Sequence, residues 1–188
     1  MRKKDYLQLS EAKDRDAYNL LLNCRHSNET QLKEFLSTNR IKAYMKQRLI
    51  EQVDIAGMRV YRLTNKGYRE FEKQLGAEHN RYHSNSILHD IKLADKYIEV
   101  MKNNANVEWR NEEDLKQLRN EQLKELRTMG DFRNYERLYN SSVCDCQYIC
   151  NEVNICFDVI TSNYTQQTIQ EKVSFASVMG SEFNSIKI

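Results

Sequence analysis

Apolar residues near the start of the chain recur every three or four positions, which is the spacing of an amphipathic helix. We predict a first helix over residues 12–24, a short second helix after the capping residues of 26–30, and a third helix from about residue 40 to about residue 52. The expected buried positions are Ala17, Leu20, Leu21 and Cys24 in the first helix, Leu32, Phe35 and Leu36 in the second, and Ile41, Tyr44, Met45, Leu49 and Ile50 in the third.

The pattern then changes to short alternating runs, which are typical of strands. Residues 53–55 and 59–63 are predicted as two strands around Ala56-Gly57-Met58, a spacing that suits a hairpin with glycine in its turn. Thr64 and Asn65 then cap another helix, which Gly76 ends.

Three helices, a hairpin and a helix in this order resemble a winged helix-turn-helix domain over roughly residues 10–76. The run Val60-Tyr61-Arg62-Leu63-Thr64-Asn65-Lys66-Gly67 is similar to the wing strand that ends in Leu-Thr-x-x-Gly in many such domains. The resemblance implies that the third helix enters the major groove of DNA and that the wing touches the backbone or the minor groove.

Cationic and small polar residues follow the predicted third helix and the wing. Lysine and arginine neutralise phosphates, and the N-terminal end of a recognition helix usually contacts base edges. The candidate DNA-binding residues are Thr38, Asn39, Arg40, Lys42, Lys46, Arg59, Arg62 and Lys66. The alternative is that these residues form solvated faces of a domain that binds protein, and we favour double-stranded DNA as the partner.

Residues 78–102 carry the longest helical pattern and are predicted to form a helix that connects two domains or pairs with its copy in a homodimer. His79 and His83 lie four positions apart on this predicted helix. No acidic or cysteine residue is placed to complete a metal site with them, so no metal is predicted.

The pattern beyond this helix is mixed. Residues 107–109 are predicted as a short strand and residues 112–128 as a charged helix with a thin apolar stripe. Residues 130–142 are expected to form a loop or an irregular helix, packed down by Phe132, Tyr135, Leu138 and Tyr139.

Two alternating runs, 144–150 and 153–159, predict a hairpin with a two-residue turn at Asn151-Glu152. This register places Cys144, Cys146 and Cys150 on one apolar face and Cys156 on the other. A zinc site would need the four cysteines to converge, so we interpret them as small apolar residues in the core.

The same register places Asp145 and Asp158 opposite each other on one face of the hairpin. Two close carboxylates repel unless a cation or a proton lies between them, and a magnesium-dependent nuclease holds its metal with such a pair. A helix over residues 165–179, with Ile169, Val173, Phe175 and Ala176 inward, and a strand over residues 183–188 are predicted to follow.

Helix, hairpin, helix and strand in this order resemble the core of the restriction-endonuclease-like fold. The whole chain resembles the replication-relaxation family of plasmids, phages and integrative elements, whose members join a winged helix to such a domain. The matching pieces are Leu63-Thr64-Asn65-Lys66-Gly67, the helix that begins near His89, Val107-Glu108-Trp109 followed by Glu112 or Glu113, and Phe157-Asp158-Val159-Ile160-Thr161 followed by Ile169-Gln170-Glu171-Lys172.

One departure from the active pattern bears on catalysis. Active nucleases of this fold carry a lysine two residues after the second acid, where this chain has Ile160. Lys172 of the next helix is a spatial substitute, although a lysine in that position more often faces solvent. We therefore favour a catalytically silent domain and keep Asp145, Asp158 and Lys172 as the catalytic set of a nuclease.

Composition limits the function without naming it. The formal charge is +2 over 188 residues, so DNA binding has to rest on a local basic patch. No apolar run is long enough to cross a membrane, and neither a membrane partner nor a secretory signal is predicted, which leaves a cytoplasmic protein as the expectation.

The sequence thus predicts an α+β protein with a winged helix-turn-helix domain over 1–77, a connecting or dimerisation helix over 78–104 and a small restriction-endonuclease-like α/β domain over 105–188. The expected function is DNA binding by a mobile-element protein in replication, mobilisation or transcription control, as a homodimer and with other replication or transfer proteins as further partners. The alternatives are a magnesium-dependent nuclease or nicking accessory, the one case that needs a cofactor, and an inhibitor or adaptor that binds protein.

Overall fold

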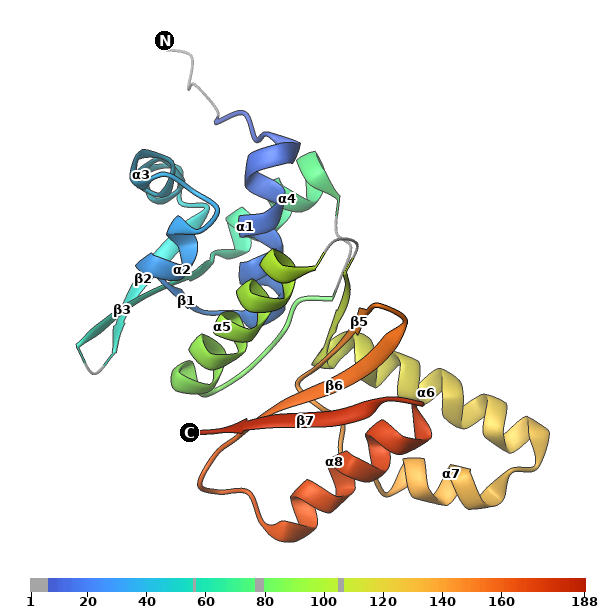
Figure 1. The fold of residues 1–188 in the computed structure, drawn as a ribbon. Coiled ribbons are helices and arrows are strands. Elements are labelled where there is room, and N and C mark those ends of the chain that lie inside the picture. The colour runs from blue at the N-terminus through green and yellow to red at the C-terminus, as the bar shows by residue number, and fades with distance from the viewer. Residues whose placement is uncertain (1–6, 56, 77–79, 105–106) are drawn as a thin grey trace. The chain divides into compact units, whose positions relative to one another are not determined.

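The computed structural model describes residues 7–55, 57–76, 80–104 and 107–188. The chain is a mixed α+β protein that divides into two compact units, Met1–Ile98 and Glu99–Ile188. Figure 1 labels the elements of both units.

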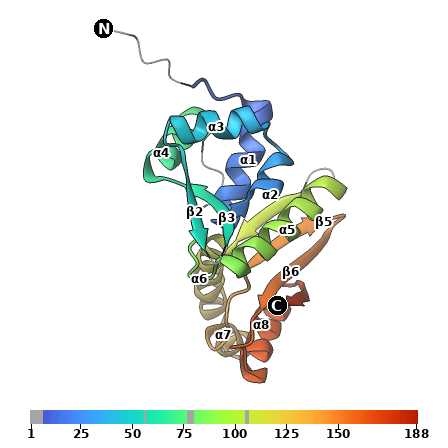
Figure 2. The same cartoon turned by 90° about the vertical axis from the view of Figure 1, so that its left-hand side faces the viewer.

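The N-terminal unit alternates helices with the strands of one sheet. Its elements are α1 (Glu11–Cys24), β1 (Ser27–Asn28), α2 (Glu29–Lys33), α3 (Thr38–Lys46), β2 (Ile50–Ile55), β3 (Met58–Leu63) and α4 (Asn65–Leu75), and α5 (Ile87–Asn103) begins in it. The strands lie in the order β1-β3-β2, and both pairs are antiparallel. The β2–β3 ribbon extends beyond α2 in Figure 1, and Figure 2 shows it from the side.

The structure confirms most of the predicted elements of this unit and corrects the third helix. α3 ends at Lys46, because Arg48 adopts a φ of 56° and turns the chain, so that Ile50 enters β2. Leu49 and Ile50 are buried as predicted, but Met45 is 36% exposed. The two-residue strand β1 was not predicted, because so short a strand has no period of its own.

The Leu-Thr-x-x-Gly run brings the start of α4 against the backbone of the turn before β2. The Thr64 side chain accepts a hydrogen bond from Gly67 N and donates one to Arg48 O, so it caps α4 and ties it to the turn before β2. A Cβ atom at Gly67 would lie 1.8 Å from Leu49 O. Only glycine therefore allows this helix start to reach the backbone of Leu49.

The helix that we predict over 78–102 begins later, at Ile87. Residues 80–86 form an irregular strap, and His83 is an exposed residue of this strap rather than of a helix. Tyr82 is buried and its N–H donates to Leu22 O, 3.0 Å away, so the strap is fixed to α1. His79 and Ala56 lie outside the described residues.

The C-terminal unit holds one mixed sheet in the order β4-β5-β6-β7. Its elements are β4 (Glu108–Asn111), α6 (Glu112–Met129), α7 (Phe132–Tyr139), β5 (Cys146–Cys150), β6 (Val153–Ile160), α8 (Gln166–Val178) and β7 (Glu182–Lys187). The first two pairs are antiparallel, whereas β6 and β7 are parallel because α8 crosses between them. The predicted hairpin is confirmed, with Cys150 opposite Val153 and positive φ angles at Asn151 and Glu152.

The helices α6, α7 and α8 share one apolar core with the sheet of this unit. The core residues are Leu115, Leu126, Leu138, Val143, Cys144, Cys156, Phe175 and Ala176. Three predictions of packing are wrong, because Phe132, Tyr139 and Val173 are exposed. Lys172 takes the inward position that the helical period gave to Val173.

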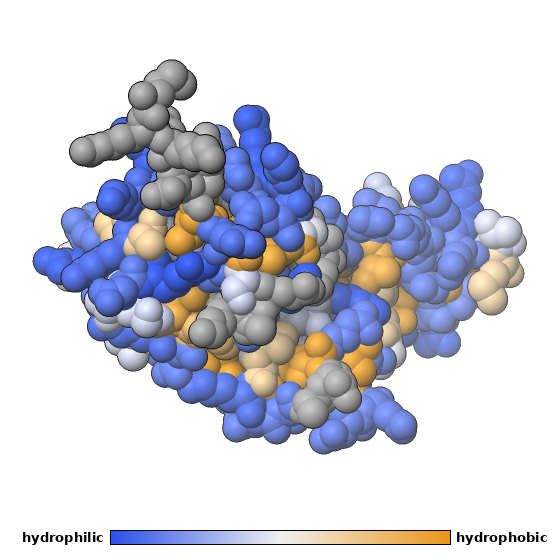
Figure 3. Space-filling view, turned by 90° about the horizontal axis from the view of Figure 1, so that it is seen from above, coloured by the Kyte–Doolittle hydropathy of each residue, from blue (hydrophilic) through white to orange (hydrophobic). Residues whose placement is uncertain are grey.

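The surface is dominated by polar side chains, as Figure 3 shows for one face. Among the described residues, no helix is long and apolar enough to cross a membrane.

Candidate functional site

The first candidate surface is formed by α3 and the β2–β3 ribbon. Thr38 and Asn39 are the first two residues of α3, and both are exposed beyond the cap that Ser37 provides. Lys42 and Lys46 are exposed farther along the helix. Neither lysine forms an ion pair with a described residue.

Arg40 differs from the other residues of α3 because its guanidinium is engaged in the domain's own structure. Its Nε lies 2.9 Å from Oδ1 of Asp14, and a second nitrogen lies 2.5 Å from Oδ2. Burial raises the pKa of Asp14, but hydrogen bonds from Arg40, Ser10 and Tyr44 outweigh burial and hold the pKa below its usual value. Arg40 therefore neutralises a fully buried carboxylate.

The three cations expected at the wing also differ in what they contact. Arg62 Nε donates to Glu51 Oε1 at 2.7 Å across the β2–β3 pair, and Lys66 Nζ donates to Gln47 O at 2.6 Å. Arg59 is exposed on β3 and forms no ion pair with the described part of the chain. Of the eight predicted residues, Thr38, Asn39, Lys42, Lys46 and Arg59 are thus left facing solvent.

Lys42 lies on α3 and Arg59 on β3, and both act on the charge of Glu29. The pKa of Glu29 on α2 is held below its usual value, first by its hydrogen bond with Lys33 and then by the fields of Arg59 and Lys42. Asn28 of β1 pairs with Val60 of β3, so Glu29 and Arg59 follow at neighbouring positions, and the field of Lys42 also reaches Glu29. The structure therefore brings part of the predicted set together on one surface.

The second candidate site is a buried polar cluster in the C-terminal unit. Cys146 pairs with Phe157. Asp145 precedes Cys146 and Asp158 follows Phe157, so the two acidic residues lie beside each other as predicted. Asp145 Oδ2 accepts a hydrogen bond from Val159 N at 2.7 Å. Lys172 Nζ lies 2.5 Å from Asp158 Oδ2 and donates to Val143 O at 2.8 Å. The structure thus brings all three residues of the predicted catalytic set together.

Burial controls the protonation of this cluster. Burial and then the nearby Asp145 carboxylate raise the pKa of Asp158 to about 7, against the opposing attraction of Lys172. Burial removes water from both oxygens of Asp158, so the Lys172 ammonium beside Oδ2 has to offset the cost of the buried charge. Burial lowers the pKa of Lys172, but the fields of Asp145 and Asp158 reverse this effect and keep the lysine charged.

Tyr164 also belongs to this cluster. No sequence pattern identifies it as a candidate residue. Its ring centroid lies 5.4 Å from Lys172 Nζ, a cation–π distance. Burial, followed by the fields of Asp145 and Asp158, raises the pKa of Tyr164, so its hydroxyl keeps its proton. No periodic pattern marks this residue, because it lies in the connection between β6 and α8.

The cysteine sorting is partly wrong. β5 begins at Cys146, so the strand alternation does not extend to Cys144. The Cys144 thiol donates to Lys172 O of α8 at 3.8 Å and lies in the same apolar core as Cys156. Cys150 Sγ instead donates to Asn104 Oδ1 at 2.7 Å. In the described ranges, no three histidine, cysteine or acidic residues are grouped as metal ligands would be.

Searches against protein-family models, curated proteins and solved structures found no match for this chain.

Proposed function

We propose that this chain is a DNA-binding protein whose N-terminal unit is a winged helix. Its element order, α1-β1-α2-α3-β2-β3, and its strand order, β1-β3-β2, support this proposal, because a winged helix would have the same order. In this reading α3 is the recognition helix and the β2–β3 ribbon is the wing.

The observation that carries the proposal is the set of exposed cations that α3 and the wing present together. Lys42, Lys46 and Arg59 form no ion pair among the described residues, so each can contact a phosphate. Thr38 and Asn39 lie at the N-terminal end of α3, where side chains reach base edges. Arg40 is not part of the proposed interface, because its guanidinium neutralises Asp14.

The resemblance to the replication-relaxation family extends the proposal to the whole chain. It implies a protein of a plasmid, phage or integrative element that acts in replication, mobilisation or transcription control. In the C-terminal unit, the antiparallel β4-β5-β6 strands and the α8 crossover to a parallel β7 are consistent with a restriction-endonuclease-like core. Such a unit would support dimerisation or contacts with other replication proteins.

The test is DNA selection from a random pool, followed by fluorescence anisotropy over a range of salt concentrations. A variant with Lys42, Lys46 and Arg59 changed to glutamine is expected to lose specific binding and to have a shallower salt dependence. Lys73→Gln on α4 is the matched control, since Lys73 is exposed outside the proposed interface. Weak binding that is equal in all variants, together with a stable protein partner, would favour the adaptor function instead.

A magnesium-dependent nuclease is the second candidate, favoured by the convergence of Asp145, Asp158 and Lys172. The two carboxylates would hold the metal, and the lysine ammonium would stabilise charge on the phosphate. The cluster is almost fully buried and Lys172 already neutralises Asp158, which favours a structural role. Plasmid cleavage with Mg²⁺ or Mn²⁺ that disappears in Asp158→Asn would establish the nuclease, and a lack of cleavage by the unchanged protein would exclude it.

A further inference from the structure

Three arginines surround one cavity in the N-terminal unit, at the base of the wing. The cavity has a volume of about 330 Å³. Arg25 lies just after α1, Arg62 on β3 and Arg81 in the strap. The remaining polar lining comes from Glu51 of β2 and from Thr64 and Asn65, where α4 begins.

Arg25 and Arg62 line the same cavity as Arg81 and lie close enough to repel its guanidinium. The pKa of Arg81 is held below its usual value, first by burial and then by the positive field of Arg25, with a smaller effect of Arg62. Glu51 is the one acidic residue of the lining, and it pairs with Arg62. Three guanidiniums and one carboxylate leave a net charge of +2 on the cavity. A bound anion would relieve this repulsion.

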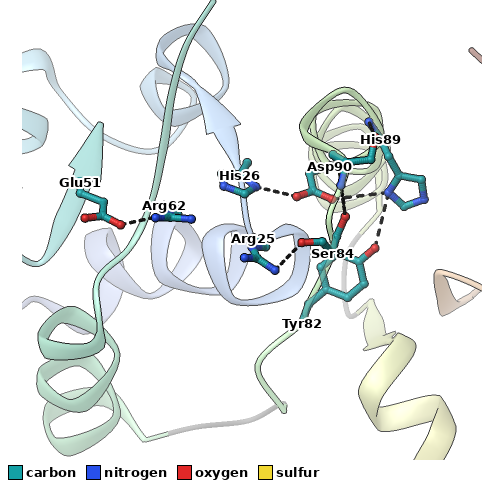
Figure 4. A network of polar contacts seen from close by, with 9 residues as sticks. Arg25, His26, Glu51, Arg62, Tyr82, Ser84, His89 and Asp90 are labelled. Carbon is teal, nitrogen blue, oxygen red and sulfur yellow. Dashed lines mark hydrogen bonds and ion pairs between the residues drawn. The ribbon is translucent and has the colours of Figure 1, made fainter. Parts of the chain in front are cut away.

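Each arginine is held in place by contacts that use only part of its hydrogen-bonding capacity. Arg25 donates to Ser84 O, and Arg62 donates through Nε to Glu51 (Figure 4). Arg81 donates to Asn65 Oδ1 at 3.0 Å and to Leu63 O at 3.1 Å. A guanidinium has more N–H donors than these contacts use, so each keeps donors for a ligand.

The strap that carries Arg81 is itself fixed by a buried network. His26 Nδ1 lies 2.7 Å from Asp90 Oδ2, and the other oxygen of Asp90 lies 3.5 Å from His89 Nδ1 (Figure 4). Tyr82 OH is 3.5 Å from the same nitrogen of His89. These contacts join the end of α1, the strap and the start of α5, so the cavity is organised before any ligand arrives.

We propose that this cavity binds a dianionic phosphate group, either inorganic phosphate or the terminal phosphate of a small phosphomonoester. Guanidinium groups bind phosphate oxygens in pairs, and the +2 lining matches the charge of a phosphomonoester near neutral pH. The positive end of the α4 dipole at Asn65 adds to this field. The volume is in the range of small-molecule sites, so there is room for the group attached to the phosphate.

Isothermal titration calorimetry at constant ionic strength tests the proposal. The probes are inorganic phosphate, AMP and adenosine, with chloride as the reference anion. Phosphate or AMP is expected to bind and adenosine is not. Arg81→Gln and Arg62→Gln should each weaken binding about tenfold or more, because each removes a charged hydrogen-bond donor. Arg69→Gln, an exposed change on α4 outside the cavity, should bind as the unchanged protein does.

Glu51→Gln gives a readout that a merely structural role would not produce. It removes the one negative charge of the lining, so phosphate should bind more tightly, whereas loss of a structural ion pair would weaken binding or leave it unchanged. Circular dichroism checks that each variant folds, and Arg62→Gln carries the test if Arg81→Gln does not fold. The proposal is wrong if phosphate has no more effect than chloride, or if Arg81→Gln and Arg62→Gln bind as the unchanged protein does. Competition by a DNA duplex without terminal phosphates would also overturn it, since the occupant would then be a phosphodiester.

Discussion

Lys172 of α8 and Asp158 of β6 form an ion pair in the interior of the C-terminal unit, with Nζ and Oδ2 2.5 Å apart. Asp158 is fully buried and the Lys172 side chain is 8% exposed, so water does little to screen either charge. The pair links the crossover helix to the strand that the helix follows. It therefore holds α8 against the sheet at one defined point.

Removing one partner of this pair should destabilise the C-terminal unit more than removing both. At pH 8, where Asp158 is ionised, Lys172→Met is expected to cost about 3 kcal/mol of unfolding free energy, because it leaves a buried carboxylate without a cation. The double variant Asp158→Leu/Lys172→Met should recover part of this loss. Trp109, the single tryptophan of the chain, lies buried in this unit and reports its urea unfolding by fluorescence. A double variant as unstable as the sum of both single variants would contradict the pairing.

The stability of the same unit should depend on pH through Asp158, whose pKa is raised to about 7. Between about pH 4 and pH 7 the folded state keeps a proton that the unfolded state loses, so stability falls as the pH rises through this range. The expected loss is on the order of 4 kcal/mol, and the dependence should level off above pH 7. Urea midpoints from Trp109 fluorescence at several pH values measure it. Asp158→Asn should flatten the profile, and an unchanged slope in this variant would assign the proton elsewhere.

Two cations of α3 should behave differently when each is replaced by glutamine. Arg40→Gln leaves the buried Asp14 without its cation and should lower the stability of the N-terminal unit by about 3 kcal/mol. Lys46→Gln should leave stability within about 0.5 kcal/mol, because the side chain is exposed, and should reduce the salt slope of DNA binding by about one. Thermal melts by circular dichroism and anisotropy at several salt concentrations separate the effects. A stable Arg40→Gln variant would return Arg40 to the candidate interface.

Gly67→Ala should destabilise the N-terminal unit by about 3 kcal/mol or more. The added methyl group would lie 1.8 Å from Leu49 O, a backbone atom that cannot move without disturbing the junction of β2 and α4. Gly57→Ala is the matched control, since it meets no atom within 4 Å and costs about 1 kcal/mol for its positive φ. Circular dichroism melts compare the two. Equal losses would show that the close approach at Gly67 is not the constraint.

Glu152→Gly should stabilise the β5–β6 hairpin. Asn151 and Glu152 have φ angles of 51° and 66°, the pattern of a two-residue turn in which glycine is preferred at the second position. Relief of the strain at Glu152 is expected to raise stability by about 0.5 kcal/mol, since the flexibility of glycine in the unfolded state offsets part of the gain. The Trp109 unfolding transition measures this, with Glu182→Gly on β7 as the control that should lower stability.

The sequence predicted the elements whose period was strong and the hairpin whose turn residues set the register. Asp145 and Asp158 could be placed side by side because a two-residue turn leaves one pairing for all the residues before it. The end of α3 was predicted too late, because Leu49 and Ile50 are buried in either conformation. Only the positive φ of Arg48 distinguishes the two, and arginine carries no signal for it.

The sequence could not show which charges of the candidate sites are already neutralised. Arg40 and Lys46 are both cations on one predicted helix, and the local pattern does not distinguish them. They differ because Arg40 pairs with Asp14, which lies far away in the sequence. Lys172 was expected to face solvent, and its partner Asp158 on a neighbouring element explains its burial. Such partners are set by tertiary packing, which no local pattern records.

The backbone of Arg25 has a φ of 63° and a ψ of −57°, a region that glycine occupies far more easily than arginine. A glycine at this position would end α1 with less strain but would remove a guanidinium from the cavity that Arg25, Arg62 and Arg81 line. The chain thus has a strained arginine at a helix end where glycine is the common residue. Arg25→Gly would relieve this strain and weaken the proposed phosphate site, so stability and phosphate binding are expected to change in opposite directions.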